Sequence, residues 1–410
     1  MTDLHALLEL ATDEVEGPDL VRTSLATARR RRTWRRGGLA SALAVIAVAG
    51  VLVVPQALDS SDPVREPAGT PGPTPSPSDE GVVAPPIEES VIQPAWDPST
   101  VASLPRYSIG HIPTVLAPGD RSTSTPGDTE GVLALSRSED DRLAVLYGER
   151  GWYGLDRVPG VGDIQDSSLS RDGTRMAVVG KGGLFWCAAA EECPEWTKVE
   201  LPERAVDEDT KITWTDDPGR LIVAGFNTGY VVDLDSGMTT ELPYLGHYTK
   251  FDVASDGTVV SQSIDPRAVL EWDGTTRLRT TETGDLDGLT DLAIHEGELA
   301  ATRIDLRYES PRATNDGDGL VVLDRDGLAT RAFLPLTGGW GEWVDAEQIK
   351  PVQWINEVTV LFSVVITPDD VGFALPERYL VAWNIETGDL GQVASSPADL
   401  DLSLRDLGPA

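Results

Sequence analysis

Two tryptophans in a glycine-rich stretch are the residues of this sequence best suited by type to hold a ligand. Trp340 and Trp343 stand in the segment LPLTGGWGEWVDAEQIKP, which begins at Leu334. Aromatic rings on an irregular loop can stack on a sugar ring or grip a peptide, because they offer a large and rigid apolar face. The alternative is that both rings cover the end of the apolar core, so that the two residues are candidates for ligand binding with a structural role left open.

Two of the four histidines are further candidates. His247 in YLGHYTK and His295 in AIHEGE lie at or near the ends of predicted strands, where an imidazole could face a ligand or serve only the local packing. The sequence contains no Gly-x-Ser-x-Gly, His-Glu-x-x-His, phosphate-binding glycine loop or Cys-His pair. We therefore predict no catalytic residue and a protein that is not an enzyme.

The only cysteines and one acidic loop could bind a metal or stiffen the fold. Cys187 and Cys193 are close enough in sequence to form a disulfide that closes a hairpin loop in an oxidising compartment. Two thiols without a nearby histidine fall short of a tetrahedral metal site. The loop YESPRATNDGDG carries alternating oxygen ligands, but Arg325 stands where a calcium loop needs Glu. We predict no metal and no cofactor, with calcium in that loop as the alternative.

The charge of the chain excludes one class of partner. Against 33 basic residues stand 67 acidic ones, for a formal net charge of -34. Such a surface repels phosphate backbones, so we predict no nucleic acid partner. The acid excess serves either solubility or attraction of a basic partner. Lysine is rare, which we attribute to a GC-rich genome; the five lysines are Lys181, Lys198, Lys211, Lys250 and Lys350.

An arginine cluster followed by an uncharged run predicts one membrane-spanning helix. Residues 37–58 carry no charge, and a helix of that length covers roughly 30 Å, the thickness of the hydrocarbon layer. A removable export signal is the alternative, but no small-x-small cleavage site follows the run. Basic residues stay in the cytoplasm, so the N-terminus is predicted inside and the rest outside. The topology determinants are Arg29, Arg30, Arg31, Arg32, Arg35 and Arg36.

Residues 1–36 are predicted to be a short cytoplasmic segment with two amphipathic helices and the arginine cluster. In outline this segment resembles the inside segments of actinobacterial single-pass regulators, including anti-sigma factors. That resemblance implies a cytoplasmic partner such as a sigma factor. The zinc-binding pattern of one His and two Cys is missing here, because His5 stands without any cysteine on this side.

Beyond the membrane, residues 59–104 are predicted to be a disordered linker rich in Pro, Ser and Thr, and residues 105–410 an all-β domain. Hairpins with Asp or Gly turns begin at residues 135, 169, 212, 253, 292 and 352, and further hairpins begin at residues 229, 267, 319 and 378. Two hairpins per unit make four strands, which is the content of a β-propeller blade. We predict six blades, or seven, and expect Tyr107–Leu116 to supply the strand that closes the ring.

The turns carry a family resemblance. Ser170 with Asp172-Gly173, and Ser255-Asp256-Gly257, each precede an apolar strand and resemble turns of WD-repeat-like and TolB-like propellers. The resemblance implies the propeller fold and does not indicate an activity. Together with the predicted membrane helix and the missing catalytic motifs, it leads us to expect a membrane-anchored extracytoplasmic binding or sensing module with a protein or glycan partner at the cell envelope. An envelope hydrolase or lyase that uses the funnel of the propeller is the alternative.

Overall fold

The described part of the chain begins after the predicted membrane segment. The structure is a computed structural model, and it describes residues 82–110, 112–118, 132–138, 141–147, 151–155, 157–189, 195–202, 205–207, 210–225, 228–245, 250–263, 267–304, 318–337, 348–367, 376–397, 401–405 and 407. The predicted inside segment 1–36 and membrane helix 37–58 lie outside these residues. Within them, no helix is long and apolar enough to cross a membrane.

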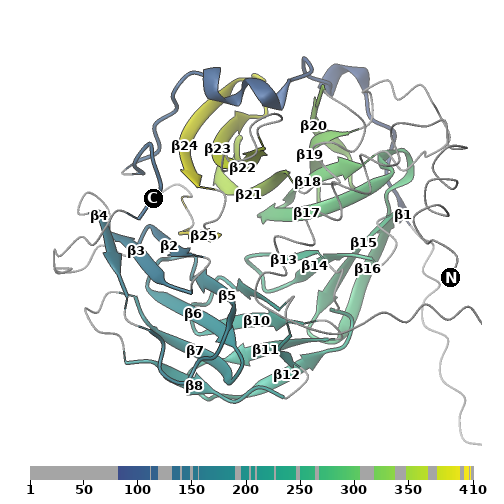
Figure 1. Cartoon of the computed structure of the whole chain (residues 1–410). Coiled ribbons are helices and arrows are strands. Elements are labelled where there is room, and N and C mark those ends of the chain that lie inside the picture. Colours follow the sequence, from purple (N-terminus) through teal and green to yellow (C-terminus); the bar gives the residue numbers. More distant parts are fainter. Residues whose placement is uncertain are drawn as a thin grey trace, which may run out of the picture. The chain divides into compact units, whose positions relative to one another are not determined.

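In the described residues the strands form six sheets arranged as a ring, which is a six-bladed β-propeller (Figure 1). Each blade is an antiparallel sheet whose strands follow one another from the centre of the ring to its rim. From centre to rim, blade 1 comprises β25 (Asp401–Leu404), β2 (Ala134–Arg137), β3 (Leu143–Tyr147) and β4 (Gly151–Gly154), and blade 2 comprises β5 (Ile164–Leu169), β6 (Arg175–Gly180), β7 (Gly183–Ala188) and β8 (Thr197–Val199).

The other four blades repeat this path. Blade 3 comprises β9 (Lys211–Trp214), β10 (Arg220–Ala224), β11 (Gly229–Asp233) and β12 (Thr239–Leu242), and blade 4 comprises β13 (Phe251–Val253), β14 (Val259–Gln262), β15 (Ala268–Asp273) and β16 (Thr276–Glu282). Blade 5 comprises β17 (Gly288–His295), β18 (Glu298–Ile304), β19 (Gly319–Asp324) and β20 (Thr330–Pro335), and blade 6 comprises β21 (Ile349–Asn356), β22 (Thr359–Ile366), β23 (Glu377–Asn384) and β24 (Leu390–Pro397). The prediction of a six-bladed β-propeller is confirmed.

The predicted Asp-Gly turns join the first and second strands of blades 2 and 4. In blade 2 the Asp172 carboxylate accepts the Thr174 backbone N–H at 3.0 Å, and Gly173 has φ of +72°. A Cβ at Gly173 would lie 2.3 Å from the Val132 carbonyl oxygen, so both the conformation and the space require glycine. Asp256 in blade 4 accepts the Thr258 N–H in the same way, at 2.9 Å. These turns let the inner strand reverse within the few residues available.

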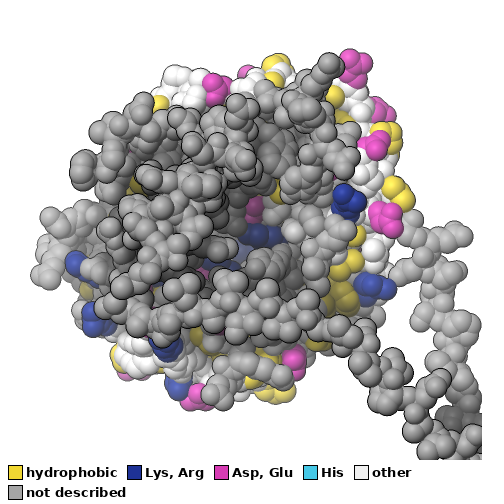
Figure 2. All heavy atoms as spheres, turned by 45° about the vertical axis from the view of Figure 1, so that its right-hand side comes forward, with side chains coloured by type: hydrophobic (Ala, Val, Ile, Leu, Met, Phe, Trp, Pro, Cys, Tyr) yellow, Lys and Arg dark blue, Asp and Glu magenta, His cyan; other side chains and the backbone are white. Residues whose placement is uncertain are grey.

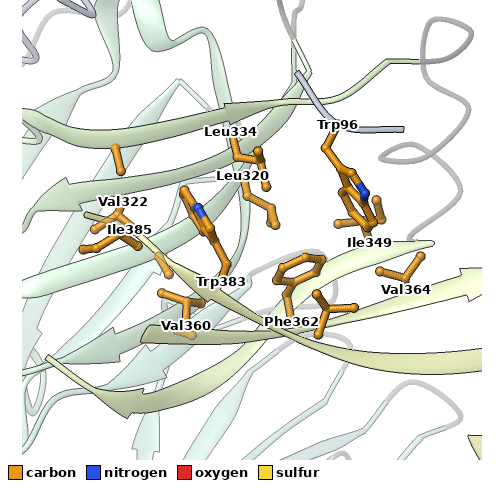
Figure 3. Packing of buried hydrophobic residues seen from close by; sticks show 14 of the residues in the cluster. Trp96, Leu320, Val322, Leu334, Ile349, Val360, Phe362, Val364, Trp383 and Ile385 are labelled. Carbon is orange, nitrogen blue, oxygen red and sulfur yellow. The ribbon is translucent and has the colours of Figure 1, made fainter. Parts of the chain in front are cut away.

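The apolar core lies between neighbouring blades. The largest cluster joins blades 5 and 6, where Trp383 and Phe362 are fully buried beside Leu320 and Leu334 (Figure 3). Comparable clusters fill the other five junctions. Because every blade packs on two neighbours, the sheets hold one another around the ring.

A segment before the first blade crosses the rims of three blades, and we call residues 82–116 the strap. Its first strand, β1 (Val82–Val83), pairs in parallel with β16 of blade 4. Bridges then join Ile92 to Phe333 and Trp96 to Leu336 on blade 5, and further ones join Arg106 and Val115 to β24 of blade 6. Short 3-10 turns (Glu89–Val91 and Pro98–Ser103) link these contacts (Figure 1).

Side chains of the strap enter the inter-blade core. The Trp96 ring packs edge-on against Phe362 at 5.7 Å between centroids (Figure 3). The Gln93 side chain accepts the indole N–H of Trp383 at 2.7 Å and donates to the Ile385 carbonyl oxygen at 2.7 Å. Residues 82–104, which we expected in a disordered linker, are therefore part of the propeller.

The ring is closed by a different strand from the one expected. Tyr107–Leu116 lies along the rim of blade 6, whereas β25 from the C-terminal end forms the innermost strand of blade 1. Consequently the hairpin that begins at Leu135 supplies the second and third strands of its blade, rather than the first and second. The physical reason is that β2 still needs a partner on its inner side, and the chain end is free to provide it.

Candidate functional site

The six inner strands run in the same direction along the central channel, because every blade repeats the same up-and-down path. They are β25, β5, β9, β13, β17 and β21. We call the end of the channel at which these strands begin the channel mouth. Figure 2 shows one face of the molecule hollowed in its middle, with basic and acidic side chains next to each other in the hollow.

Three of the five lysines stand at the channel mouth. Lys211 is the first residue of β9, Lys250 directly precedes β13, and Lys350 is the second residue of β21. Arg378 is the second residue of β23, two strands further out in blade 6, and its charge also acts on Lys350. Four cations from three blades thus gather at one end of the channel in a chain whose formal net charge is -34.

Carboxylates hold the neighbouring inner strands in position. The Asp166 carboxylate of β5 accepts the backbone N–H of Ile212 in β9 at 2.7 Å, next to Lys211. The Asp252 carboxylate of β13 accepts the N–H of Ile294 in β17 at 2.8 Å. Burial raises the pKa of Asp252, while the nearby Arg171 guanidinium and two backbone N–H groups oppose that rise. These links join the inner strand of blade 2 to that of blade 3, and the inner strand of blade 4 to that of blade 5.

Asp291 supplies a negative charge among the four cations. It lies at a β-bulge in β17 between Thr290 and Ala293, with φ of +50°, a conformation that is uncommon for a residue other than glycine. Its carboxylate lies 3.2 Å from the Lys250 ammonium. The bulge interrupts the regular alternation of side chains along the inner strand. The Asp291 carboxylate therefore acts on cations of both neighbouring blades, Lys250 in blade 4 and Lys350 in blade 6.

The electrostatic balance at the mouth disfavours the charged form of Lys350. Water reaches this side chain, but protein atoms displace part of its hydration, and this desolvation lowers the pKa of Lys350 from the usual 10.5. Asp291 acts in the opposite direction, and the charges of Arg378, Lys211 and Lys250 lower the pKa further. Among the described residues, the charges of Arg378, Lys211, Lys250 and Asp291 thus all act on Lys350.

The two remaining lysines have a different environment. Lys181 lies 2.7 Å from Asp163 and Lys198 lies 2.7 Å from Glu200, both on the exposed surface. Hydrogen bonding to Asp163 raises the pKa of Lys181. Each of these two lysines thus forms an ion pair on the exposed surface.

The arrangement at the mouth can do two things chemically. Ammonium and guanidinium groups are hydrogen-bond donors without acceptor capacity, so together they bind anions. A lysine whose pKa is lowered by desolvation and like charges loses its proton more readily than an ordinary lysine and can also act as a base.

Of the residues predicted to bind a ligand, His295 alone lies in the described part of the chain. It ends β17, at the opposite end of the channel from the lysines, and its ring stacks on Trp354 with centroids 5.8 Å apart. Trp354 is buried and donates its indole N–H to the Ala293 carbonyl oxygen at 3.1 Å. His295 thus covers the core between blades 5 and 6, which matches its structural alternative.

The other candidates lie outside the described residues. Trp340 and Trp343 fall in the connection from β20 to β21, and His247 falls in the connection from β12 to β13. These connections lead directly to Lys350 and Lys250. Their role in ligand binding stays a prediction.

Cys187 and the acidic loop complete the list of sequence predictions. Cys187 is buried in β7, whereas Cys193 lies outside the described residues, so their disulfide stays a prediction. Most of the loop that offered oxygen ligands, between β18 and β19, also lies outside. Among the described residues, no group of three or more His, Cys, Asp or Glu side chains could hold a metal ion.

The lysines at the mouth were missed by reasoning from the sequence, although a signal was present. In KITW, KFDV and KPVQW a lysine stands within three residues of the start of a predicted repeat. Because equivalent positions of a propeller repeat lie at the same height around the channel, this recurrence places the lysines together. Because the rarity of lysine was explained by a GC-rich genome, the recurrence of lysine at the start of the repeats was not recognised as a signal.

The fold and the site together define a six-bladed β-propeller with a cationic channel mouth. No protein-family model matches the chain, and no curated protein matches it. Solved structures that resemble it include the Neurospora crassa Pan2 WD40 domain, with 12% identity, a TM-score of 0.41, and 78% of this chain and 86% of that chain covered.

Two further structures are similar in the same way. YCF48 bound to D1 peptide has 9% identity and a TM-score of 0.45, over 70% of this chain and 87% of that one. A protein of unknown function from Bacteroides caccae has 11% identity and a TM-score of 0.39, over 65% of this chain and 99% of that one. Similarity at this level carries no argument about ligand or activity.

Proposed function

We propose that this protein is a non-catalytic binding module, held outside the cell membrane by its N-terminal helix and receiving its partner at the channel mouth. The observation that carries the proposal is the gathering of Lys211, Lys250, Lys350 and Arg378 at one end of the channel. Like charges repel one another, so a cluster of this kind costs folding stability, and such costs are typical of functional sites. The partner is a protein or a glycan of the cell envelope.

The membrane part of the proposal rests on the arginine cluster and on residues 37–58. Protease added to intact cells should trim the propeller and leave the inside segment protected. Protection of the propeller, or a mature chain that begins after Ala57, would contradict this topology. Through residues 1–36 the anchored protein could signal to a cytoplasmic partner such as a sigma factor, and co-purification with that segment tests the link.

The binding part is tested by site-specific photo-crosslinking in membranes that display the full-length protein. A photoreactive phenylalanine analogue at Phe251, beside Lys250, reports on the mouth. The same analogue at Met238, which is 68% exposed in the turn between β11 and β12, is the matched control at the opposite face. We expect one species to be crosslinked from Phe251 and not from Met238. Equal capture from both positions, or capture from Met238 alone, would refute a partner at the mouth.

A second candidate function is favoured by the lowered pKa of Lys350. In an envelope lyase the uncharged amine of this lysine would remove the proton beside the carboxylate of an acidic sugar, a C=C bond would form, and the glycosidic C–O bond would break, with water protonating the leaving oxygen. The other cations would neutralise the carboxylate. Ultraviolet absorption of the new double bond during incubation with polyuronates would support the lyase, provided that Lys350→Arg abolishes it. An unchanged spectrum with a range of polyuronates would exclude it.

A further inference from the structure

We propose that Arg171, Asp216 and Asp252 form a clasp that ties blades 2, 3 and 4 together at the end of the channel opposite the mouth, and that this clasp releases β13 in an acidic medium. The inference goes beyond the binding function proposed above and does not depend on it. It assigns to the ring a conformational device that responds to protons.

A single side chain of blade 2 reaches the two blades that follow it. Arg171 lies in the turn between β5 and β6, and one of its Nη atoms lies 2.5 Å from the Asp216 carboxylate, in the turn after β9 of blade 3. The other Nη atom lies 3.2 Å from the Asp252 carboxylate and donates to the Val253 carbonyl oxygen at 2.5 Å, both in β13 of blade 4. Blades 2 and 4 are not neighbours in the ring, so Arg171 joins them past the inner end of blade 3.

The propeller repeat does not require an arginine at this position. The corresponding turns of blades 3 to 6 read TDDPG, ASDGT, EG and EV, without a basic residue, whereas the turn of blade 2 reads SRDGT. The turn itself is held by Asp172, which accepts the Thr174 N–H and the Ser170 hydroxyl. Arg171 is therefore explained by the groups that it reaches on other blades and not by its own hairpin.

The strand β13 depends on polar links more than the other inner strands do. It has three residues and is the shortest inner strand in the described part of the ring, and the apolar cluster between blades 3 and 4 is the smallest of the six inter-blade clusters found there. The Asp252 carboxylate accepts the Ile294 N–H of blade 5 at 2.8 Å and also faces Arg171. Loss of the charge on this one carboxylate would weaken links to blades 2 and 5 at once.

The elements packed against β13 carry few titratable groups. They are β14, β9 and β17. No residue of β14 is titratable, β9 begins with Lys211, and β17 carries Asp291 and His295. Lys250 directly precedes β13 and lies 3.2 Å from Asp291, so these two charges oppose each other near the mouth.

The groups that act on Asp252 come mainly from the adjoining turns. Burial raises the pKa of Asp252, the Arg171 guanidinium and two backbone N–H groups lower it, and the Asp216 carboxylate raises it. The other carboxylates of these turns, Asp172 and Asp256, accept hydrogen bonds within their own turns. With a pKa above that of an ordinary aspartate, Asp252 takes up a proton earlier as the medium is acidified.

Acid favours the open clasp, because the closed and open forms bind this proton with different strength. In the closed form the Arg171 guanidinium opposes protonation of Asp252. In the open form the carboxyl group stays buried without that guanidinium, so its pKa is higher. By linkage, a fall in pH shifts the population from the closed form to the open one.

Release of the clasp reaches the channel mouth because β13 is short. Val253 and Phe251 are the two ends of this strand, so a strand that is loose at Val253 is also less firmly held at Phe251. The backbone carbonyl of Lys250, just before the strand, accepts the Gln262 N–H at 2.9 Å. We therefore expect exchange of backbone amides to rise along the whole of β13.

The experiment is hydrogen–deuterium exchange of the full-length protein in an uncharged detergent, followed by mass spectrometry between about pH 7.5 and about pH 4.5. Rates are corrected for the intrinsic dependence of amide exchange on pH. We expect peptides that contain β13 and β17 to exchange roughly tenfold faster at the acidic end, while the peptide that contains β22 of blade 6 keeps its protection.

Single variants identify the groups. Arg171→Gln should move the loss of protection to higher pH by roughly one unit or more, and Asp216→Asn should move it to lower pH, because they remove charges of opposite sign from the surroundings of Asp252. Asp252→Asn should exchange quickly at every pH. The matched control is Arg175→Gln, which should behave as the wild type. Its side chain is 25% exposed, against 24% for Arg171, and lies 3.2 Å from Asp235 of blade 3.

Three results would overturn the proposal. They are exchange of β13 that does not change with pH in the wild type, a pH dependence that persists in Asp252→Asn, and equal shifts in Arg171→Gln and Arg175→Gln. If Asp252→Asn does not fold, the other two clasp variants decide, because they are expected to shift the transition in opposite directions. Shifts of Arg171→Gln and Asp216→Asn in the same direction would show that both residues only support the structure.

Discussion

Lys350 lies in a place that disfavours the charged form of its side chain. Desolvation and the nearby cations lower its pKa in the folded state below the usual 10.5. The unfolded chain therefore binds this proton more tightly than the folded protein does. By linkage, this lysine costs stability below its folded pKa, and the cost disappears as the pH rises from the folded value to the unfolded one.

Removal of this charge should consequently stabilise the protein. We predict that Lys350→Gln raises the free energy of unfolding at neutral pH by about 0.5–2 kcal/mol, the usual range for stabilising changes. Urea unfolding of the full-length protein measures the effect, with Lys198→Gln as a control that should change little. A clear loss of stability in Lys350→Gln would show that this ammonium is held by the fold and not by a ligand.

Asp291 should favour the charged form of Lys350. Asparagine tolerates the left-handed backbone that Asp291 adopts at φ of +50°, so Asp291→Asn removes the charge and leaves the bulge in place. We predict that the pKa of Lys350 then falls further below 10.5, because a carboxylate that favours its charged form is lost. NMR titration of the lysine side chains compares the two proteins. An unchanged pKa of Lys350 in Asp291→Asn would mean that this carboxylate does not act on it.

At the level of elements, the strap is the feature that joins distant parts of the chain. Trp96 is buried beside Phe362 in the core between blades 5 and 6, and its backbone N–H donates to the Pro335 carbonyl oxygen at 2.9 Å. The neighbouring Ile92 is 44% exposed on the same segment. Substitution of Trp96 therefore tests the buried packing of the strap, and substitution of Ile92 tests an exposed part of the same segment.

Truncation of Trp96 should weaken the propeller. We predict that Trp96→Ala lowers the free energy of unfolding by about 3–5 kcal/mol, as is usual when a buried tryptophan is removed from a core. Ile92→Ala should change it by no more than about 0.5 kcal/mol. Denaturant titration followed by tryptophan fluorescence or circular dichroism would show the difference. Equal effects in both variants would indicate that the strap does not contribute to the core.

The blades could be predicted from the sequence, whereas the strap could not. Each hairpin is a local pattern, such as Ser170 with Asp172-Gly173 before an apolar strand, so its signal lies within a few residues. The strap makes isolated parallel contacts with residues far away in the chain, such as Ile92 with Phe333. Its composition is also rich in proline, which favours an extended chain and indicates a linker when read alone.

The candidate site, too, could be predicted from the sequence only in part. The sequence directed attention to aromatic and imidazole side chains, and His295 proved to pack on Trp354. The lysines carried no motif, because their common feature is a position within the repeat and not a spacing between neighbours. Arg378 could not have been grouped with them, since it belongs to a different strand of its blade.

For the molecule as a whole, closure of the ring depends on the C-terminal strand. The Ser403 hydroxyl oxygen of β25 accepts the backbone N–H of Leu169 at 2.9 Å, and β25 pairs with β2 along its whole length. Because β25 follows β24 of blade 6 in the chain and forms the innermost strand of blade 1, it joins the last blade to the first, and it also contacts blade 2. Its loss would expose an inner edge of the sheet to water.

A chain that ends at Pro397 should therefore melt at a lower temperature than the full-length protein. We predict a drop of roughly 5–10 °C, from the loss of a core strand in a domain of this size. A chain that ends at Leu407 keeps β25 and should melt as the full-length protein does. Identical melting of the shorter chain, measured by circular dichroism, would mean that β25 is not needed to close the ring.

The distribution of charge over the molecule leads to the most direct test. With five lysines in the chain, NMR of the protein carrying 13C-dimethylated lysines gives one signal per side chain, assigned by single Lys→Arg variants. Lys350 should titrate below 10.5. On addition of the species that is crosslinked from Phe251, we predict shifts in the signals of Lys211, Lys250 and Lys350, and none in those of Lys181 and Lys198. Equal shifts of all five signals, or shifts of Lys181 and Lys198 alone, would contradict binding at the channel mouth.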